Sequence, residues 1–263
     1  MSSSKAKISA LLITYNEEHN IEEVINNISF ADEIIVVDSY SSDSTVTLIK
    51  KHEHVTLIQR KFINYTDQKS FALEQATYDW VLFLDADERI TPKLKDEIIS
   101  VTNGIKNDIV AYFFTRTFMF QNKILKYSGW QSDKNYRLFR KSKVHFTKKR
   151  IVHETLIVDG KSNILKNKLL HYSYKNYEDY KSKMVKYGKM KAVEEAKKGK
   201  KAYWLHFIFR PWYKFFNHYI LRLGILDGKN GIIICYLNAL GVYTRYKELK
   251  RISKLPQANT AGH

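Results

Sequence analysis

The sequence predicts an α/β protein in which helices flank a mainly parallel sheet and a basic helical extension follows. Between Ile8 and Leu84, short apolar segments with β-branched residues alternate four times with helical patterns, the spacing of right-handed βαβ units. From Glu178 onward the pattern changes to a long lysine-rich helix. We therefore expect a sheet domain first and helices after it.

Four segments have the composition of strands buried on both faces of a sheet. They are Ile8–Thr14, Glu33–Val37, Val55–Gln59 and Trp80–Leu84. Three polar clusters follow strand ends: Thr14-Tyr15-Asn16, Asp38 and Asp85-Ala86-Asp87. Because parallel strands end at one edge of a sheet, and ligands bind at that edge, we expect the clusters to share one crevice.

The second half of the chain begins with aromatic-rich strands and loops at residues 111–146. The basic helix follows, to about Lys200, and then an apolar, aromatic segment from Trp204 to about Tyr246. Every uncharged stretch of that segment, including Gly231–Thr244, is shorter than the roughly 20 residues of a membrane span. We therefore expect it to lie on a membrane, or to form a helical core with solvated lysines, and not to cross a bilayer.

Charge is unevenly distributed along the chain. Residues 1–136 carry 15 Lys and Arg against 19 Asp and Glu, whereas residues 137–263 carry 29 against 8. Such a basic half suits anionic lipid, nucleic acid or an acidic substrate. The single cysteine, Cys235, excludes an intrachain disulfide and a cysteine-rich zinc site. With no secretory signal pattern, we expect a cytoplasmic protein.

The strongest chemical signal is Asp85-Ala86-Asp87-Glu88, directly after the fourth strand. An isolated acidic turn of this kind is usually just solvated. Its place after a buried strand, together with the two upstream clusters, favours a site for Mg or Mn, which prefer oxygen ligands and bridge phosphate oxygens. The ion would stabilise a departing nucleoside diphosphate.

These motifs resemble the family 2 glycosyltransferases of the GT-A (Rossmann-like) fold. The likeness rests on residues 12–17 (LITYNE), 36–45 (VVDSYSSDST), 68–73 (QKSFAL) and 85–88 (DADE). It is closest to the bacterial branch that includes lipopolysaccharide core β-1,4-glucosyltransferases, which shares residues 31–39 (ADEIIVVDS) and 84–89 (LDADER). The resemblance is specific from Ile8 to about Pro92 and looser from there to about Tyr174. It fades in the basic C-terminal region.

The resemblance implies roles for the donor-side residues, which are Thr14, Tyr15, Glu17, Asp38, Lys69, Asp85 and Asp87. The first three would lie near the nucleotide, and Asp38 would accept the uracil imide N–H unless it merely caps the next helix. Lys69 would lie near the base or diphosphate, unless it is a surface lysine. Asp87 would hold the metal, with Asp85 on the donor nucleotide. Tyr40 replaces a glycine that many relatives have in this turn.

An inverting transferase also needs a base to deprotonate the acceptor hydroxyl. Glu154, in Val152-His153-Glu154, matches the branch's His-Glu pair and is the candidate base, unless it only pairs with Lys149 or Arg150. Asp133, in Trp130-Gln131-Ser132-Asp133, is the second candidate base; if it is not the base, it would bind the acceptor. Trp130 and His153 would help to position the acceptor.

Three further residues are weaker candidates. Arg137 and Arg140 would face the diphosphate or acceptor from one strand, or else form a solvent-facing pair. His171 would be a late metal ligand or phosphate contact, or a buried structural histidine.

The resemblance implies an inverting, metal-dependent transferase that moves a hexose from a UDP-sugar, UDP-glucose first, to a cell-envelope glycan such as lipopolysaccharide core. Residues 1–175 would form the transferase domain, and residues 176–263 a basic, aromatic region. That region would hold the enzyme on the anionic cytoplasmic face of the inner membrane, with no nucleic-acid partner.

Other classes explain less of the sequence. A non-catalytic membrane- or nucleic-acid-binding protein on a degenerate transferase fold explains the charge but not the polar clusters at strand ends. A nicotinamide-dependent oxidoreductase would need a G-x-G-x-x-G turn where the chain has Thr-Tyr-Asn-Glu. A nucleotidyltransferase would need a basic, glycine-rich first loop.

Overall fold

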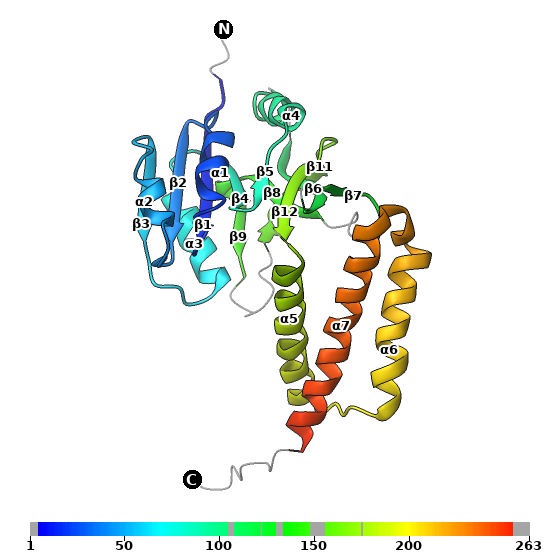
Figure 1. The fold of residues 1–263 in the computed structure, drawn as a ribbon. Coiled ribbons are helices and arrows are strands. Elements are labelled where there is room, and N and C mark those ends of the chain that lie inside the picture. Colours follow the sequence, from blue (N-terminus) through cyan, green and yellow to red (C-terminus); the bar gives the residue numbers. More distant parts are fainter. Residues whose placement is uncertain are drawn as a thin grey trace, which may run out of the picture. The chain divides into compact units, whose positions relative to one another are not determined.

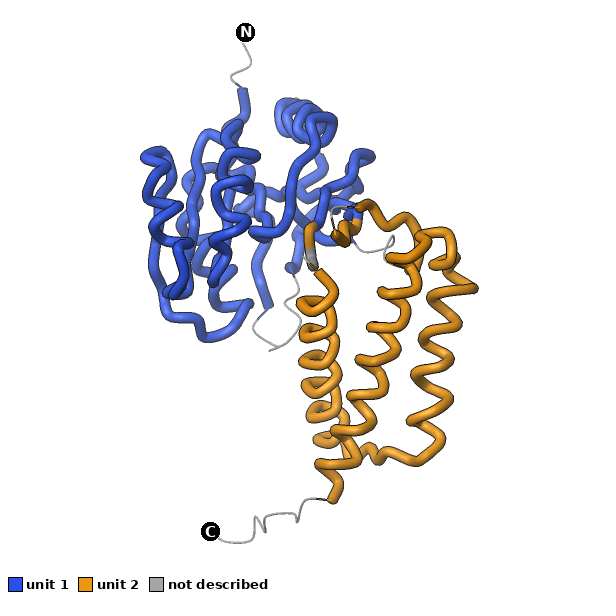
Figure 2. The backbone as a smooth tube through the Cα atoms, viewed as in Figure 1, with its two compact units in different colours: residues 1–117, 132–171 blue, residues 118–131, 172–263 orange. Residues whose placement is uncertain are grey.

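The computed structural model describes residues 5–104, 108–121, 123–129, 134–147, 156–174 and 176–254. The chain forms two compact units, which Figure 2 distinguishes by colour. Unit 1 comprises residues 1–117 and 132–171, and unit 2 comprises residues 118–131 and 172–263. The functional division at residue 175 remains a prediction.

The first four strands form the parallel part of a larger sheet (Figure 1). They are β1 (Ile8–Thr14), β2 (Glu33–Asp38), β3 (Val55–Gln59) and β4 (Trp80–Asp85). Their order is β3-β2-β1-β4, and all three pairings are parallel. This confirms the predicted α/β arrangement, because each crossover between parallel strands passes through a helix or a helical turn.

Beyond β4 most pairings are antiparallel, although β11 pairs with β6 in parallel, so the whole sheet is mixed. Its order continues β8-β6-β12-β5, with β7 and β11 also on β6 and a separate β9–β10 pair. These strands are β5 (Glu88–Arg89), β6 (Ile109–Phe120), β7 (Lys123–Leu125), β8 (Lys134–Arg140), β9 (Val144–Phe146), β10 (Leu156–Val158), β11 (Lys161–Ile164) and β12 (Leu169–Tyr174). A short 3-10 turn, η1 (Lys141–Lys143), links β8 to β9.

Helices pack on both faces of the parallel strands. They are α1 (Ile21–Asn27), α2 (Thr45–Ile49), α3 (Tyr65–Gln75) and α4 (Pro92–Thr102). Because side chains alternate along a strand, Ala10 and Leu12 of β1 pack with residues of α1, α2 and α4, whereas Leu11 packs with α3. Helix α3 is capped by Asn64, whose Oδ1 accepts the Asp67 N–H at 2.9 Å. The cap fixes where α3 begins, beside the strand ends.

Unit 2 is mainly helical, as the sequence predicts for its C-terminal part. Its elements are α5 (Tyr177–Lys197), α6 (Trp204–Phe216), the π-helical turn η2 (Asn217–Leu221), the 3-10 turn η3 (Gly224–Asp227) and α7 (Gly228–Ser253). Helix α7 packs against both α5 and α6 (Figure 1). At Gly188 a Cβ would lie 2.5 Å from the Gly241 carbonyl oxygen, so the α5–α7 contact requires glycine there.

The core of unit 2 is built around aromatic and aliphatic side chains. Tyr180 of α5 is fully buried, packs against Phe120 with ring centroids 6.0 Å apart, and donates its hydroxyl to Asn238 Oδ1 at 3.0 Å. Among the described residues, no helix combines the length and the apolar character that crossing a membrane requires.

Candidate active site

The loops after β1 and β2 are held together around Asp38. Thr14 and Asp38 are paired in the register of the two strands, and the Thr14 hydroxyl donates to Asp38 Oδ1 at 3.2 Å. Asp38 Oδ2 accepts the Ser41 N–H at 2.9 Å. The Asp38 carboxylate is fully buried, so the turn at residues 38–41 and the end of β1 are locked together. Helix α2 begins after Ser44, so Asp38 does not cap it.

Two residues in these loops have left-handed backbone conformations. Asn16 has φ +56° and Tyr40 has φ +60°. Tyr40 thus adopts the left-handed conformation that favours glycine. Asn16 fits because its side-chain Oδ1 accepts the Ser42 N–H at 2.8 Å. Tyr15 and Tyr40 are both more than half exposed, so these loops present two free aromatic rings.

Glu17 and Lys69 reach the same edge from different elements. The Glu17 N–H donates to the Thr45 hydroxyl at 2.7 Å, which ties the first loop to α2. Lys69 of α3 is only 8% exposed and its Nζ lies 4.0 Å from Asp85 Oδ1. It is therefore not a surface lysine, although its contact with a nucleotide remains a prediction.

The acidic motif after β4 contains a network of buried charges. Arg137 of β8 donates Nη2 to Asp85 Oδ2 and, at 2.8 Å, to Glu88 Oε1. Arg116 of β6 donates to the same Glu88 oxygen at 3.3 Å, and Glu88 Oε2 accepts the Asp85 N–H at 3.1 Å. Glu88 is fully buried, and Arg137 is 6% exposed. This network holds Asp85 in place.

Burial and the arginines act on the two carboxylates in opposite ways. Burial by itself would raise the pKa of Asp85, but the charges of Arg137 and Lys69 hold the pKa of Asp85 well below its usual range. For Glu88, burial prevails over the Arg137 charge, and the pKa of Glu88 is raised. Asp85 therefore gives up its proton more readily than Glu88 does.

Asp87 is oriented differently from Asp85 and meets His171. Strand β12 pairs antiparallel with β5, which places His171 opposite Glu88 in register. His171 Nε2 lies 3.3 Å from Asp87 Oδ2, and both side chains are partly exposed. The structure therefore brings together the two residues that the sequence nominated for a metal.

Asp87 and His171 fit a divalent ion that shares its coordination with phosphate. A carboxylate oxygen and an imidazole nitrogen are ligands that Mn²⁺ accepts, and Mg²⁺ is usually held by one or two carboxylates plus substrate phosphates. In the described residues, no group of three or more His, Cys, Asp and Glu side chains is arranged for a metal. The donor set thus suits an ion completed by a diphosphate and water.

Arg137 and Arg140 do not share one face, contrary to the sequence expectation. They are three residues apart, so they point to opposite faces of β8. Arg140 is paired in register with Trp80 at the far end of β4, contacts Asp79 at 3.1 Å and lies 4.5 Å from the Trp80 ring. Arg137 belongs to the acidic motif's network, whereas the structure does not bring Arg140 to it.

Four candidate residues lie outside the described part of the chain. They are Trp130, Asp133, His153 and Glu154. The acceptor contacts and the choice of base therefore remain predictions.

The sequence analysis included Glu88 in the acidic motif but gave it no role, and it did not name Arg116. A signal for Arg116 was present, because it is the one charged residue in the otherwise apolar and hydroxyl-bearing strand IVAYFFTRTFMF. A charge in such a strand needs a buried partner. The partner is Glu88, which only strand pairing brings near.

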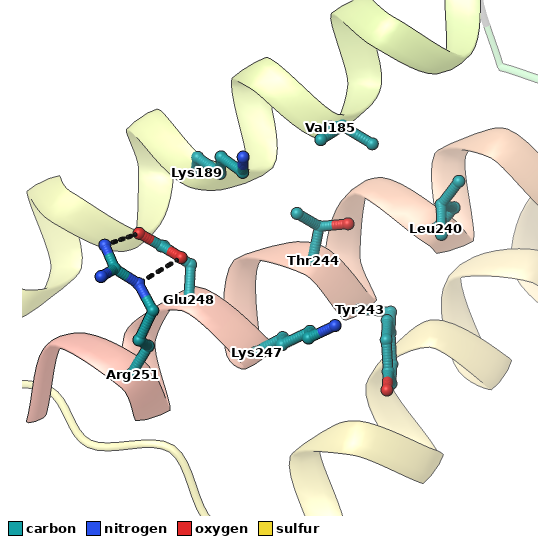
Figure 3. Close-up of a pocket in the computed structure, with 8 residues that line it drawn as sticks. All are labelled: Val185, Lys189, Leu240, Tyr243, Thr244, Lys247, Glu248 and Arg251. Carbon is teal, nitrogen blue, oxygen red and sulfur yellow. Dashed lines mark hydrogen bonds and ion pairs between the residues drawn. The ribbon is translucent and has the colours of Figure 1, made fainter. Parts of the chain in front are cut away.

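Unit 2 contains a separate groove with a volume of about 590 Å³ (Figure 3). Its lining comes from α5 and α7 and comprises Val185, Lys189, Leu240, Tyr243, Thr244, Lys247, Glu248 and Arg251. Glu248 is ion-paired with Arg251 at 2.7 Å, which leaves two lysines to set the charge of the groove. None of the predicted site residues lines it.

Comparison with known proteins identifies the family. Residues 9–159 match Glycosyl transferase family 2. A protein of Rickettsia conorii described as an uncharacterized glycosyltransferase is 30% identical over 94% of this chain and 91% of its own. LpsC, a lipopolysaccharide core biosynthesis glycosyltransferase of Rhizobium meliloti, is 26% identical over 92% and 94%.

Among solved structures, Staphylococcus aureus TarS is 16% identical, covers 94% of this chain and 91% of the other, and has a TM-score of 0.47. The family match and the mixed sheet flanked by helices confirm the predicted family and GT-A fold class. The chain therefore belongs to the family 2 glycosyltransferases.

Proposed function

We propose that the protein is an inverting, divalent-metal-dependent transferase that moves a hexose from a UDP-sugar to a cell-envelope glycan. UDP-glucose is the first donor to test and lipopolysaccharide core the first acceptor. The acceptor class is supported by the similarity to LpsC, whose name places it in lipopolysaccharide core biosynthesis.

The observation that carries the proposal is the gathering of donor-side residues at one sheet edge. Thr14 and Asp38 lie at the ends of β1 and β2, and Asp85 and Asp87 lie at and just after the end of β4. Lys69 lies 4.0 Å from Asp85, so positive charge accompanies the carboxylates. A nucleoside diphosphate needs this combination, with polar groups for the base and balanced charge for the phosphates.

Each of these residues has a proposed task. The Asp38 carboxylate is held by the Thr14 hydroxyl and by the side-chain amide of Gln59 at the end of β3, and its proposed task is to accept the uracil imide N–H. Asp87 and His171 would hold the Mg²⁺ or Mn²⁺ ion, which when bound stabilises negative charge on the leaving diphosphate. Arg137 orients Asp85, and Tyr15 and Tyr40 offer exposed rings for the base or sugar.

The acceptor hydroxyl needs a base, for which we propose Glu154, with Asp133 as the alternative. The Glu154→Gln variant should bind UDP with wild-type affinity and lose transfer, since an amide cannot take up the hydroxyl proton. The matched variant is Asp133→Asn. If Asp133→Asn shows this behaviour and Glu154→Gln does not, the two roles must be exchanged.

The donor is identified by the release of UDP from a panel of UDP-hexoses in the presence of lipopolysaccharide core acceptor and Mn²⁺. The proposal expects acceptor-dependent release with one donor well above the others, and a product with inverted anomeric configuration by NMR. Retention of configuration, or transfer from donors other than UDP-sugars, would contradict it.

We also propose that the protein works on the cytoplasmic side of the inner membrane, with the anionic leaflet as a partner and without nucleic acid. Residues 1–175 would carry the transfer reaction, and residues 176–263 the membrane contact. A glycolipid acceptor in that leaflet would then meet an enzyme that is already bound to the membrane surface. The basic balance of residues 137–263 supports this, because each basic residue near an anionic leaflet contributes on the order of 1 kcal/mol.

A further inference from the structure

Helix α6 presents apolar side chains outward over most of its length. It has no buried residue. The side chains that point out are Leu205, Ile208, Phe209, Trp212, Tyr213 and Phe216, with exposed fractions between 38% and 63%. Their spacing of three and four residues puts them on one side of the helix. An ordinary surface helix exposes mainly polar side chains.

The inward side of α6 includes polar side chains. His206 and Lys214 are half-buried on that side, together with Phe207 and Phe215. The His206 ring packs against the Tyr246 ring with the centroids 4.8 Å apart. Burial lowers the pKa of Lys214, as do the charges of Arg222 and Arg245. The helix therefore half-buries a lysine while it exposes a tryptophan and a phenylalanine, an orientation that water alone would not favour.

The exposed apolar surface continues past the end of α6. Leu221, Leu223, Ile225 and Leu226, in and between the turns η2 and η3, are each at least 48% exposed. Together with the outward residues of α6 they form what we call the apolar ridge, residues 204–226. Large exposed apolar patches on folded proteins mark surfaces that bind a partner or a membrane.

The charge of the same segment points to an anionic partner. From Gly199 to Leu226 the chain has no Asp or Glu, and its basic residues are Lys200, Lys201, Arg210, Lys214 and Arg222. Aromatic rings with one polar end, interleaved with basic residues, suit the boundary between lipid headgroups and acyl chains. At 13 residues, α6 is too short to span a bilayer and suits a position in the plane of the interface.

We propose that the apolar ridge inserts into the headgroup layer of an anionic leaflet, with the outward side chains of α6 at the acyl boundary and Lys200, Lys201 and Arg210 at the lipid phosphates. This deepens the membrane partnership of the proposed function by assigning it to one surface. It does not depend on which sugar the enzyme transfers.

The full chain is tested by co-sedimentation with phosphatidylcholine vesicles, with and without phosphatidylglycerol. We expect binding to the anionic vesicles and much weaker binding to the neutral ones. The Phe209→Ser/Trp212→Ser variant should bind anionic vesicles about tenfold less or weaker still, because two aromatic insertions are lost. The matched control is Tyr187→Ser/Met190→Ser on α5, whose two side chains are also about half exposed and should not matter.

A charge-reversal variant separates the electrostatic contribution to membrane binding from the contribution of the inserted apolar side chains. Lys201→Glu/Arg210→Glu should lose the preference for anionic vesicles while leaving the apolar side chains intact. Tryptophan emission gives the depth, since quenching by brominated lipid should affect wild type strongly and Trp212→Phe less, with binding of Trp212→Phe retained.

Two outcomes would overturn the inference. One is equal binding by the α6 double variant and the α5 control. The other is a homodimer in sedimentation velocity that becomes monomeric in the α6 variant while no vesicles bind, which would make the ridge a contact between copies. UDP titration of the same samples distinguishes failure of this inference from failure of the proposed function. A variant that loses membrane binding but still binds UDP has an intact donor site.

Discussion

The two units differ in where they place costly side chains. In unit 1, Arg137 and Glu88 are charged residues removed from water at the end of β4. In unit 2, Phe209 and Trp212 of α6 are aromatic residues that face water. Both arrangements work against folding, one through desolvation of charge and the other through exposed apolar area. We propose that a ligand accounts for each arrangement, the donor nucleotide in unit 1 and a membrane in unit 2.

The largest effect should come from removing the buried arginine. Arg137→Met leaves Glu88 buried without its closest counter-charge and should lower the free energy of unfolding by about 3–5 kcal/mol in denaturant titration. Arg140→Met on the same strand is the matched control, because the half-exposed Arg140–Asp79 pair should contribute at most about 1 kcal/mol. Equal losses would contradict the view that burial distinguishes the two arginines.

A buried histidine should make unit 2 sensitive to acid. His218 Nδ1 lies 2.8 Å from the Ser128 carbonyl oxygen, and burial with the nearby Lys214 charge lowers the pKa of His218 to about 4. The unfolded chain takes up this proton near pH 6.5, so His218 contributes stability above that pH. At most about 3 kcal/mol should be lost as the pH falls from 6.5 to 4.

His218→Asn keeps a donor near the Nδ1 position and removes the titration. Comparing its unfolding free energy with that of wild type at pH 7.5 and pH 4.5 cancels the groups that both proteins share. If the two proteins lose the same stability between these pH values, His218 is not the group responsible.

A smaller effect, and a gain in stability, is expected at the turn after β2. Tyr40→Gly should raise the free energy of unfolding by about 0.5–1 kcal/mol, since glycine adopts the left-handed conformation without strain but loses more chain entropy. Tyr40→Ala keeps the strain and should bring no gain. UDP affinity of both variants would show whether the exposed ring also contacts the nucleotide.

The smallest change in stability should come from the apolar ridge. Phe209→Ser/Trp212→Ser should leave the free energy of unfolding within about 0.5 kcal/mol of wild type, because both side chains are about 60% exposed. A loss comparable to that of Arg137→Met would mean that the ridge packs against the protein. The contrast between the units would then fail.

Sequence patterns predicted the parallel half of the fold well, because its signals are local. The strands Ile8–Thr14 and Val55–Gln59 have the predicted bounds, and the helix predicted from Glu178 corresponds to α5. The antiparallel half depends on pairing between distant segments, so the approach of Arg116 and Arg137 to Glu88 could not be read from spacing. The side of α6 that faces water was equally hidden, since periodicity shows that a helix has two sides but not which one packs.

The donor site is tested most directly by calorimetric titration with UDP, with and without Mn²⁺, on wild type, Asp87→Ala and the surface control Asp96→Ala. We expect Mn²⁺-dependent binding in wild type and Asp96→Ala and its loss in Asp87→Ala, with all three proteins folded by circular dichroism. Mn²⁺-dependent binding of wild-type strength in Asp87→Ala would contradict the metal assignment. No UDP binding by folded wild type under any condition would contradict the proposed function itself.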